Sequence, residues 1–430
     1  MKHTILHITV HLGGGVGSVI MNWIKTDIEN SHTILCLNNN YYKTYDTNIV
    51  HENMRHKQQE IIEWVDKSDI VVVHFWNHPL LYKFITVCRL PPCRLCIWSH
   101  ISGFNPPYVF SDKLIAFSDR FVFASPISYN TPEIISLPPE EKTKLGHIWT
   151  TGNIDEYSKV SPISHDGFNI GFIGTLDYSK LHPNFIDFCS KIDIPDVKFI
   201  ICGDGCDADK IKQQVKDKGL EDKFLFTGVI DDIKPYLSII DVFGYPLNPT
   251  HFGTCEQVLG EAIAAGIIPV VMNNPAEEYI LFQSLVKFIC TTEQEYVHNI
   301  ELLYNNKQRQ NSLINLIQEN IISLYSSNNM IESWNTVFKE QMETPKKNRS
   351  WFMSKKRRKM GGAGMFLDSI GKYGTIFESN DTKAIKNLFK SNLQWFSNSK
   401  GSPRQYLNTF PNDKHLIGWV NLLEELEQGD

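Results

Sequence analysis

Glycines are concentrated directly after the first apolar segment of the chain, where backbone amides could bind an anion. The apolar run 4–10 leads into a glycine-rich loop over 13–18, and a helical pattern follows over 16–28. Glycine lets the backbone approach a phosphate closely, and a helix start supplies N–H donors with a positive partial charge. The alternative is a tight strand-to-helix turn without a ligand, because the spacing of the dinucleotide fingerprint is absent. The expected diphosphate-binding residues are Gly14, Gly15, Val16 and Gly17.

Two glutamates, Glu256 and Glu261, lie in the predicted helix 255–265, which leads into a strand with buried character. Thr254 and Gln257 have the spacing of a capping box, so we expect the helix to begin here. Ionised glutamate seldom faces a core without a partner, and a carboxylate there can accept hydrogen bonds from both hydroxyls of a ribose. The alternative is that Glu256 complements the helix dipole and Glu261 lies at the surface.

These candidate residues lie near the ends of short apolar segments that alternate with helical patterns. Continuous apolar strands separated by helices indicate a parallel sheet that is buried on both faces. The rhythm starts twice, with a linker at 162–167, so we expect two α/β units with a cleft at the carboxyl ends of their strands. The predicted domains are a Rossmann-like domain over 1–165, a second Rossmann-like domain over 166–342, and a basic linker with a helical extension over 343–430.

The overall composition excludes several classes of protein. At 430 residues the chain is too long for one hydrophobic core. Its net charge of −6 excludes a protein that binds nucleic acid through its overall charge. The nine cysteines are odd in number and lie mostly in apolar runs, which is typical of reduced thiols. We see no signal peptide and no stretch long enough to span a membrane, and therefore expect a cytoplasmic protein.

One segment closely follows a known family. Residues 260–271 read GEAIAAGIIPVV, which resembles the EAMAAG-x-PVV stretch of the retaining glycosyltransferases of family 4 (GT4). Further segments resemble motifs of that family in the same order: the glycine loop, 149–155, 171–175 with Lys180, 202–205, and 226–229 followed by 241–242. The resemblance covers roughly residues 1–342. It implies the GT-B fold, in which two Rossmann-like domains face a central cleft, here with a small helical appendage. In that fold, residues 1–165 form the acceptor-side domain and residues 166–342 the donor domain.

The resemblance also assigns roles to individual residues. Glu261 corresponds to the glutamate that binds the ribose hydroxyls, and Lys180 to the lysine that binds the donor diphosphate, a task that suits a flexible point charge. His100 takes the place of the family's cleft histidine, where neutral imidazole can hydrogen-bond a sugar hydroxyl or support charge at the anomeric carbon. A satisfied loop histidine is the alternative for His100. For His74, which ends an earlier strand-like run, we expect a structural or acceptor-side role.

Two positions depart from the family pattern. Thr175 stands where the family has an arginine, so one cation for the diphosphate is missing. Gly253 stands where the first glutamate of the family's E-x7-E pair would fall, and the nearest carboxylate is that of Glu256. Helix positions five apart point about 140° away from each other. Glu256 therefore shares a ligand with Glu261 only if it acts from the start of the helix.

The resemblance thus implies a retaining glycosyltransferase that needs neither a metal nor a cofactor. Its expected donor is a UDP- or GDP-sugar, and its expected acceptor is a glycan or a lipid-linked glycan of bacterial surface polysaccharide synthesis. The alternatives are a sugar-nucleotide 2-epimerase of the same fold and a catalytically degenerate glycan-binding protein. The expected catalytic residues are His100 and Glu256. The expected donor-binding residues, besides the glycine loop, are Thr175, Lys180, Gly253, Thr254 and Glu261.

Two weaker patterns carry less information. Asp207-Ala208-Asp209 spells the D-x-D of metal-dependent glycosyltransferases, but it begins a predicted helix, where acidic residues complement the dipole. The basic run from Lys355 to Lys359 predicts peripheral contact with the anionic inner face of a membrane, where each cation contributes about 1 kcal/mol. The alternatives for this run are a solvated charge cluster and a linker.

Overall fold

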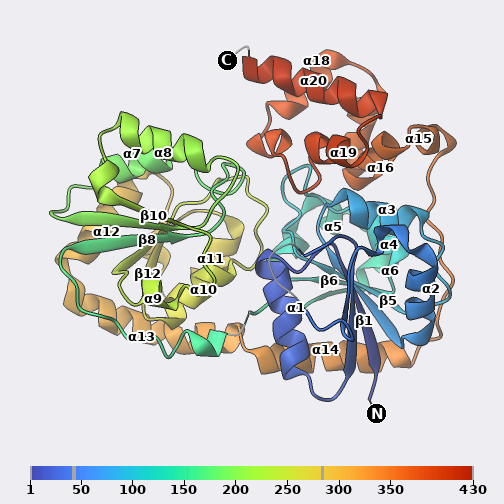
Figure 1. Ribbon diagram of the computed structural model, residues 1–430, viewed down its shortest axis with the longest axis horizontal. Coiled ribbons are helices and arrows are strands. Elements are labelled where there is room, and N and C mark those ends of the chain that lie inside the picture. The colour runs from blue at the N-terminus through green and yellow to red at the C-terminus, as the bar shows by residue number, and fades with distance from the viewer. Residues whose placement is uncertain (1, 41–44, 153, 282–284, 429–430) are drawn as a thin grey trace. The chain divides into compact units, whose positions relative to one another are not determined.

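The computed structural model describes residues 2–40, 45–152, 154–281 and 285–428. The chain forms two compact units: unit 1 comprises residues 1–150 and 330–430, and unit 2 comprises residues 151–329. Each unit is built on one parallel sheet (Figure 1). Asn153, which belongs to the motif at 149–155, lies outside the described residues.

The sheet of unit 1 has seven strands in the order β3-β2-β1-β4-β5-β6-β7. Neighbouring strands are parallel throughout. Every residue of the central strand β4 is buried, as its apolar sequence IVVVHF requires for a strand covered on both faces. The strands are β1 (Thr4–Thr9), β2 (Ser31–Cys36), β3 (Val50–His51), β4 (Ile70–Phe75), β5 (Leu95–Ser99), β6 (Arg120–Phe123) and β7 (Leu145–His147).

Helices from distant parts of the chain cover this sheet (Figure 1). Trp23 of α1 (Gly14–Thr26) stacks on Trp334 of α14 (Ser327–Met342), with ring centroids 4.8 Å apart. Both indoles meet Trp98 of β5 edge-on. This buried aromatic cluster ties α14 to the sheet of unit 1. The other helices before the extension are α2 (Gln58–Lys67), α3 (Pro79–Val87), α4 (Asp112–Phe117), α5 (Pro132–Ile135) and α6 (Pro139–Lys142).

Unit 2 repeats the pattern with a six-stranded parallel sheet in the order β10-β9-β8-β11-β12-β13. Its strands are β8 (Phe168–Ile173), β9 (Val197–Cys202), β10 (Phe224–Gly228), β11 (Val242–Tyr245), β12 (Ile268–Met272) and β13 (Ile289–Cys290). Its helices are α7 (Phe185–Ser190), α8 (Ala208–Asp217), α9 (Lys234–Leu237), α10 (Gln257–Ala264), α11 (Pro275–Leu281), α12 (Glu293–Asn305) and α13 (Lys307–Leu324).

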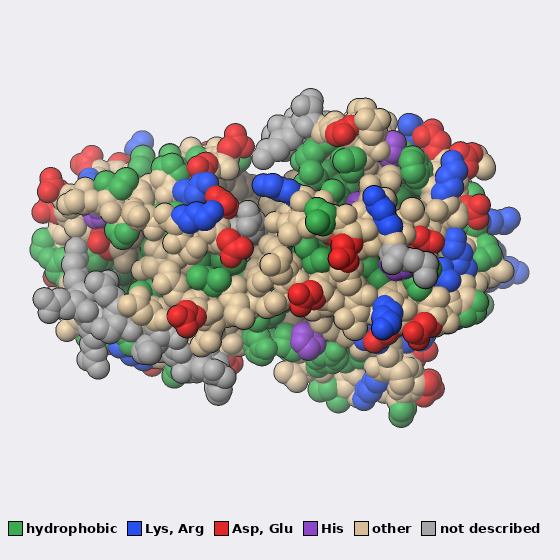
Figure 2. Space-filling model, turned by 90° about the horizontal axis from the view of Figure 1, so that it is seen from below, with side chains coloured by type: hydrophobic (Ala, Val, Ile, Leu, Met, Phe, Trp, Pro, Cys, Tyr) green, Lys and Arg blue, Asp and Glu red, His purple; other side chains and the backbone are tan. Residues whose placement is uncertain are grey.

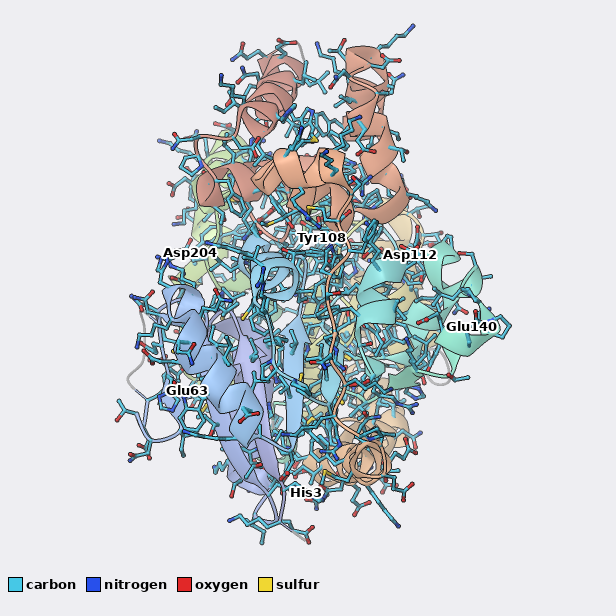
Figure 3. All side chains as sticks on the ribbon, turned by 90° about the vertical axis from the view of Figure 1, so that its right-hand side faces the viewer. His3, Glu63, Tyr108, Asp112, Glu140 and Asp204 are labelled. Carbon is cyan, nitrogen blue, oxygen red and sulfur yellow. The ribbon has the colours of Figure 1, made fainter. Side chains whose placement is uncertain are left out.

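The C-terminal extension is helical and has its own aromatic core. Its helices are α15 (Lys355–Lys359), α16 (Gly362–Ser369), α17 (Gly374–Glu378), α18 (Thr382–Phe389), α19 (Pro403–Thr409) and α20 (Lys414–Gln428). The buried Asp368 carboxylate accepts hydrogen bonds from Lys113 at 2.9 Å and from the Trp351 indole at 2.8 Å. Figure 3 shows these helices above the sheet of unit 1, beside the loop that carries Tyr108. The extension is therefore anchored on unit 1.

The expected α/β fold with two parallel sheets and a helical extension is confirmed. The compact units divide the chain differently from the predicted ranges 1–165, 166–342 and 343–430, because α14 and the extension both pack on unit 1. The predicted start of the helix at 255 is wrong. Glu256 is the N-cap residue of α10, and its side chain makes no capping hydrogen bond. Within the described ranges, no helix is long and apolar enough to cross a bilayer.

Candidate functional site

Lys180 and Glu256 form an ion pair inside unit 2. Nζ of Lys180 lies 3.2 Å from Oε2 of Glu256, and the two side chains are 19% and 3% exposed. The Tyr245 hydroxyl, at the end of β11, donates a hydrogen bond of 2.7 Å to the same oxygen. Nζ of Lys180 lies 5.6 Å from the Tyr245 ring centroid, so the lysine also meets an aromatic face. The lysine remains partly open to solvent, whereas the carboxylate is enclosed.

His251 and Glu277 extend this charged network into the interior. Nε2 of His251 lies 3.3 Å from the buried carboxylate of Glu277, and Nδ1 lies 3.8 Å from that of Glu256. Burial alone would lower the pKa of His251, but Glu277 and Glu256 outweigh it and raise that pKa. Burial alone would raise the pKa of Glu256, but Lys180 and His251 lower it to about 2. Glu256 is therefore a carboxylate at neutral pH.

Gly253 leaves the space that the Glu256 carboxylate occupies. A Cβ atom at position 253 would lie 1.7 Å from Oε1 of Glu256, so no larger residue fits without displacing that side chain. The backbone of Glu256 has φ 33°, in the left-handed region that L-residues rarely adopt. This conformation places Glu256 just before α10, so the helical period does not separate it from Glu261. The structure thus brings the carboxylate of Glu256 to the place where a side chain at 253 would begin.

Glu261 lies within α10 in a different electrostatic setting. Its side chain is partly buried, and burial raises its pKa to about 7. No donor among the described residues hydrogen-bonds its carboxylate. The charge of Glu261 also contributes to the raised pKa of the nearby Tyr157 hydroxyl, after burial as the main cause. A carboxylate without a partner in this position is available to a ligand that carries hydroxyl donors.

The loop that carries Thr175 and Lys180 is held by close backbone packing. A Cβ at Gly203 would lie 1.9 Å from the carbonyl oxygen of Gly174, and one at Gly205 would lie 2.3 Å from that of Leu176. Positions 203 and 205 therefore accept only glycine where they pack against this loop. Thr175 itself is exposed directly after β8. Thr254 is buried close to α10.

The carboxylates of the D-x-D pattern do not converge on a common point. Asp207 accepts a hydrogen bond of 2.9 Å from the backbone N–H of Tyr178, and the Asp209 side chain is fully exposed. Asp177, Cys206 and Asp207 do place ligand atoms within 4.8 Å of one another. The Asp207 carboxylate in that group serves the turn that holds residue 178, so we assign it a structural role.

The glycine loop of unit 1 forms the start of α1. Gly13 is the N-cap residue, no side chain caps it, and no acidic residue lies in the first turn. Gly14 and Gly15 are exposed, and Val16 is partly buried. Gly17 is buried where a Cβ would lie 1.9 Å from the carbonyl oxygen of Leu12. The exposed helix start fits anion binding, while Gly17 is required for packing.

His100 ends a continuous line of hydrogen-bonded side chains in unit 1, which we call the histidine relay. The line starts at Asp27, whose Oδ2 lies 3.1 Å from Nε2 of His32. Nδ1 of His32 lies 2.9 Å from Nε2 of His7. Nδ1 of His7 lies 3.0 Å from Nε2 of His74, and Nδ1 of His74 lies 3.1 Å from Nε2 of His100. His74 therefore has a structural partner on each side, in agreement with a structural role.

The sequence did not indicate three members of the relay. His7 and His32 lie in short apolar strands, and Asp27 follows α1. The available signal was a histidine inside each of several buried strands, since polar side chains are uncommon there. The order and register of the strands, which only the fold supplies, bring them into contact. The predicted site residues therefore form a charged network in unit 2, and in unit 1 an exposed helix start and a histidine at the end of the relay.

Comparison with known proteins connects unit 2 to a family. Residues 153–319 match the family described as "Glycosyl transferases group 1". A curated relative, the 2-deoxystreptamine N-acetyl-D-glucosaminyltransferase of Niallia circulans, is 30% identical over 107 residues, or 24% of this chain and 26% of that protein. The match thus spans about a quarter of the relative's length. The group 1 segment contains Lys180, Gly253, Glu256 and Glu261.

Solved structures share the fold beyond the group 1 segment. Anabaena Alr3699/HepE in complex with UDP-glucose has a TM-score of 0.63 at 15% identity, covering 79% of this chain and 100% of that one. A glycosyltransferase from Rickettsia africae ESF-5 has a TM-score of 0.61 at 13% identity, covering 80% and 99%. The chain therefore has the GT-B fold, with two Rossmann-like parallel-sheet domains and an additional helical C-terminal region.

Proposed function

We propose that this protein is a glycosyltransferase that moves a sugar from a nucleoside-diphosphate sugar to a glycan or lipid-linked acceptor. The observation that carries the proposal is the pair of carboxylates in the group 1 segment, one held ionised by Lys180 and one left without a partner. A UDP-sugar is the first donor to test, because the similar HepE structures contain UDP or UDP-glucose. GDP-sugars are the second. Bacterial surface polysaccharide synthesis is the pathway we propose.

In this proposal, Lys180, Glu261 and Glu256 each bind a different part of the donor. Lys180 binds the diphosphate, because it is partly exposed and a flexible ammonium suits two phosphates. Glu261 accepts hydrogen bonds from the ribose hydroxyls. Glu256 contacts the transferred sugar. In unit 1, His100 binds a sugar hydroxyl, and the start of α1 binds a phosphate or an acceptor anion. Thr175 adds at most a hydroxyl to this group.

We further propose that transfer proceeds with retention and without a metal. The bond from the anomeric carbon to the diphosphate oxygen breaks first, and positive charge develops at the sugar. The acceptor oxygen then bonds to the anomeric carbon from the same face, and its proton passes to the departing phosphate. Lys180 stabilises the negative charge on the leaving group, which is the role that a metal fills elsewhere.

Two alternatives make different predictions. A sugar-nucleotide 2-epimerase of the same fold would consume the donor with no acceptor present and would release an epimer. A degenerate glycan-binding protein would bind glycans but would show no donor turnover. Thr175 in place of arginine and the glycine at 253 favour neither alternative, because Glu256 and Lys180 keep a charged pair in the group 1 segment.

Thermal shift with a panel of UDP-, GDP- and ADP-sugars tests the proposal, because a ligand that binds the folded state raises its stability. We expect a rise in Tm of several degrees with one nucleotide series, on the order of 2.7 kcal/mol of stabilisation at 100 times Kd. The same donor should then be consumed when glycan acceptors are supplied. Absence of a shift with every member of the panel would count against the proposal.

We also propose that Glu256 supplies the carboxylate that is missing at position 253. The double variant Gly253→Glu/Glu256→Gly moves the carboxylate to the family position and places glycine where φ is 33°. We expect it to recover at least about tenfold in kcat/KM over either single variant, equivalent to about 1.4 kcal/mol of coupling. Donor turnover by the three variants is the measurement.

The single variants serve as the controls for this exchange. Gly253→Glu places a second carboxylate against the first, and Glu256→Gly leaves Lys180 without its partner. If the double variant is no more active than the better of the two, while its Tm shows that it folds, Glu256 has a different role.

The basic run supports the proposed membrane contact only in part. Arg357 is committed to Asp368 at 2.7 Å and Glu378 at 2.9 Å within the extension. Lys355, Lys356, Arg358 and Lys359 are exposed. Figure 2 shows the opposite face of the protein, on which basic and acidic side chains are interspersed. We propose that the four exposed cations contact anionic lipid, and flotation with vesicles containing phosphatidylglycerol against vesicles of phosphatidylcholine tests this contact.

A further inference from the structure

The histidine relay crosses four neighbouring strands on one face of the sheet of unit 1. The strands are adjacent in the order β2-β1-β4-β5. His32 pairs in register with Ile5, so His7 lies two residues further along β1. The same step of two residues separates His7 from His74 and His74 from His100. Because side chains two residues apart share a face, the four rings form one diagonal line that ends beyond β5.

The relay is enclosed over most of its length. His7 and His74 are fully buried, and the His32 side chain is 3% exposed. The Trp23 ring meets His7 edge-on with centroids 4.9 Å apart, and Trp98 lies 4.9 Å from His100. Solvent therefore does not compete for the inner nitrogens. His100 is the partly exposed end, and its Nδ1 atom has no hydrogen-bond partner in the described part of the chain.

Asp27 gives the relay a direction. Its Oδ1 accepts hydrogen bonds from the backbone N–H groups of Glu29 and Asn30, and its Oδ2 accepts one from the Asn30 amide. Burial alone would raise the pKa of Asp27, but the hydrogen bonds from His32 and Asn30 hold that pKa well below its usual value. The carboxylate is therefore ionised and can only accept. Nε2 of His32 must carry the hydrogen that points toward it.

Counting donors then fixes every other ring. A neutral imidazole has one N–H and one lone pair. If Nε2 of His32 carries the hydrogen, its Nδ1 accepts from His7. His7 therefore carries its hydrogen on Nε2, and its Nδ1 accepts from Nε2–H of His74. In the same way, Nδ1 of His74 accepts from Nε2–H of His100, so that Nδ1 of His100 keeps a lone pair.

We propose that Asp27, His32, His7 and His74 are positioning residues that fix the tautomer of His100, so that its Nδ1 accepts a hydrogen bond from a ligand hydroxyl. The nature of the ligand rests on the proposed function, in which the hydroxyl belongs to a sugar. A phosphate oxygen facing this nitrogen would meet a lone pair and be repelled. The relay thereby assigns His100 to a hydroxyl.

The relay holds His100 in one tautomer and does not conduct protons to Asp27. A proton taken up at Nδ1 of His100 and passed inward would reverse all four rings and end as a neutral carboxyl at Asp27. The hydrogen bonds that stabilise the Asp27 carboxylate disfavour that state. Burial also keeps His7, His74 and His100 neutral by lowering their pKa values, that of His100 to about 3. An added proton on any of the four rings would place a hydrogen on Nδ1 of His100. The proposal therefore requires all four rings to be neutral.

Nitrogen-15 correlation spectra of the full-length protein, labelled at histidine, read the tautomers directly at about pH 7.5 and without any ligand. Single histidine substitutions assign the signals. We expect His7, His32, His74 and His100 all to carry the hydrogen on Nε2. An Nδ1–H or a doubly protonated ring at any of these four positions would overturn the proposal. Because no sugar nucleotide is present in the sample, this outcome is independent of whether the protein transfers sugars.

Asp27→Asn tests whether the direction comes from the carboxylate. Two backbone N–H groups need an acceptor at Oδ1, whereas the Asn30 amide at Oδ2 has a second acceptor in Asn335. The new amide oxygen therefore takes the Oδ1 place, and the NH₂ group faces Nε2 of His32. We expect the relay to reverse and Nδ1 of His100 to become a donor. Donor turnover should then fall about tenfold or more in kcat/KM with the Kd for the free nucleotide unchanged, since an aspartate that orients a histidine acts through its tautomer.

Asp69→Asn is the matched control. Asp69 lies in the same unit, accepts from Thr4 at 2.8 and 2.9 Å and does not touch the relay. It should leave all four tautomers unchanged. Should Asp27→Asn not fold, His7→Leu interrupts the line, and His100 should then show mixed tautomers while His32 keeps Nε2–H. An unaltered His100 in a folded Asp27→Asn or His7→Leu variant contradicts the proposal.

Discussion

Replacing Glu261 with glutamine is expected to weaken binding of the donor nucleotide about 10- to 100-fold and, above pH 7, to stabilise the folded protein. The loss of affinity follows because hydrogen bonds from ribose hydroxyls to a carboxylate are worth about 1.5–3 kcal/mol, and a neutral amide makes weaker ones and offers only one acceptor oxygen. Titration calorimetry with the nucleotide identified by the thermal shift panel measures this change.

The gain in stability follows from the raised pKa of Glu261. Burial brings that pKa to about 7 from an ordinary value of 4.5, so between these values the folded state holds a proton that the unfolded state has released. Stability therefore falls as the pH rises through this window, and above pH 7 the fold must accommodate an ionised carboxylate. Glutamine removes that cost, which we expect to be about 1–2 kcal/mol because the side chain is only partly buried.

The pH dependence separates this result from a simple packing change. The difference in Tm between Glu261→Gln and the natural protein should be small near pH 4.5 and largest above pH 7. Glu278→Gln, on the exposed surface of α11, is the matched control and should change neither affinity nor Tm. A variant that binds nucleotide as well as the natural protein would remove Glu261 from the site.

Replacing Lys180 with alanine should have the largest effect on turnover. The variant loses the cation proposed for the diphosphate, and it leaves Glu256 enclosed at 3% exposure without its 3.2 Å partner. Truncation of one member of a buried charge pair costs about 2–5 kcal/mol. We expect kcat/KM for the donor to fall on the order of 10²- to 10³-fold, with a lower Tm, as measured by donor turnover and calorimetry.

Two further variants distinguish the two effects of this change. Lys180→Ala/Glu256→Gln should recover much of the Tm, because the unpaired charge is gone, but should not recover turnover. Lys218→Ala breaks an exposed ion pair with Asp187 at 2.7 Å in the same unit and should cost at most about 1 kcal/mol. If Lys180→Ala lowers the Tm but leaves kcat/KM unchanged, the lysine serves only the fold.

The local chemistry of the sequence was sufficient for the elements of the fold and for the group 1 motifs. Continuous apolar strands such as β4 predicted parallel sheets, because a strand covered on both faces has no solvent side. Gly266 has φ 84° directly after α10, as its place behind an apolar helix indicated. The resemblance around Glu261 placed that residue on a helix next to a buried strand. These inferences concern residues that are close in sequence, whose spacing along the chain determines which of them share a face or a turn.

What the tertiary structure alone decided depends on contacts between segments that are far apart in sequence. Gly253 and Glu256 were an irregularity in a motif until the left-handed backbone at 256 brought the carboxylate into the space left at 253. The buried stack of Trp23 on Trp334 shows that α14 packs on unit 1. The hydrophobic pattern of that helix does not indicate which sheet it covers. The histidine relay needed the strand order β2-β1-β4-β5 and a register step of two residues at each pairing. Strand order and register arise from packing the whole sheet, so no single segment of the sequence contains them.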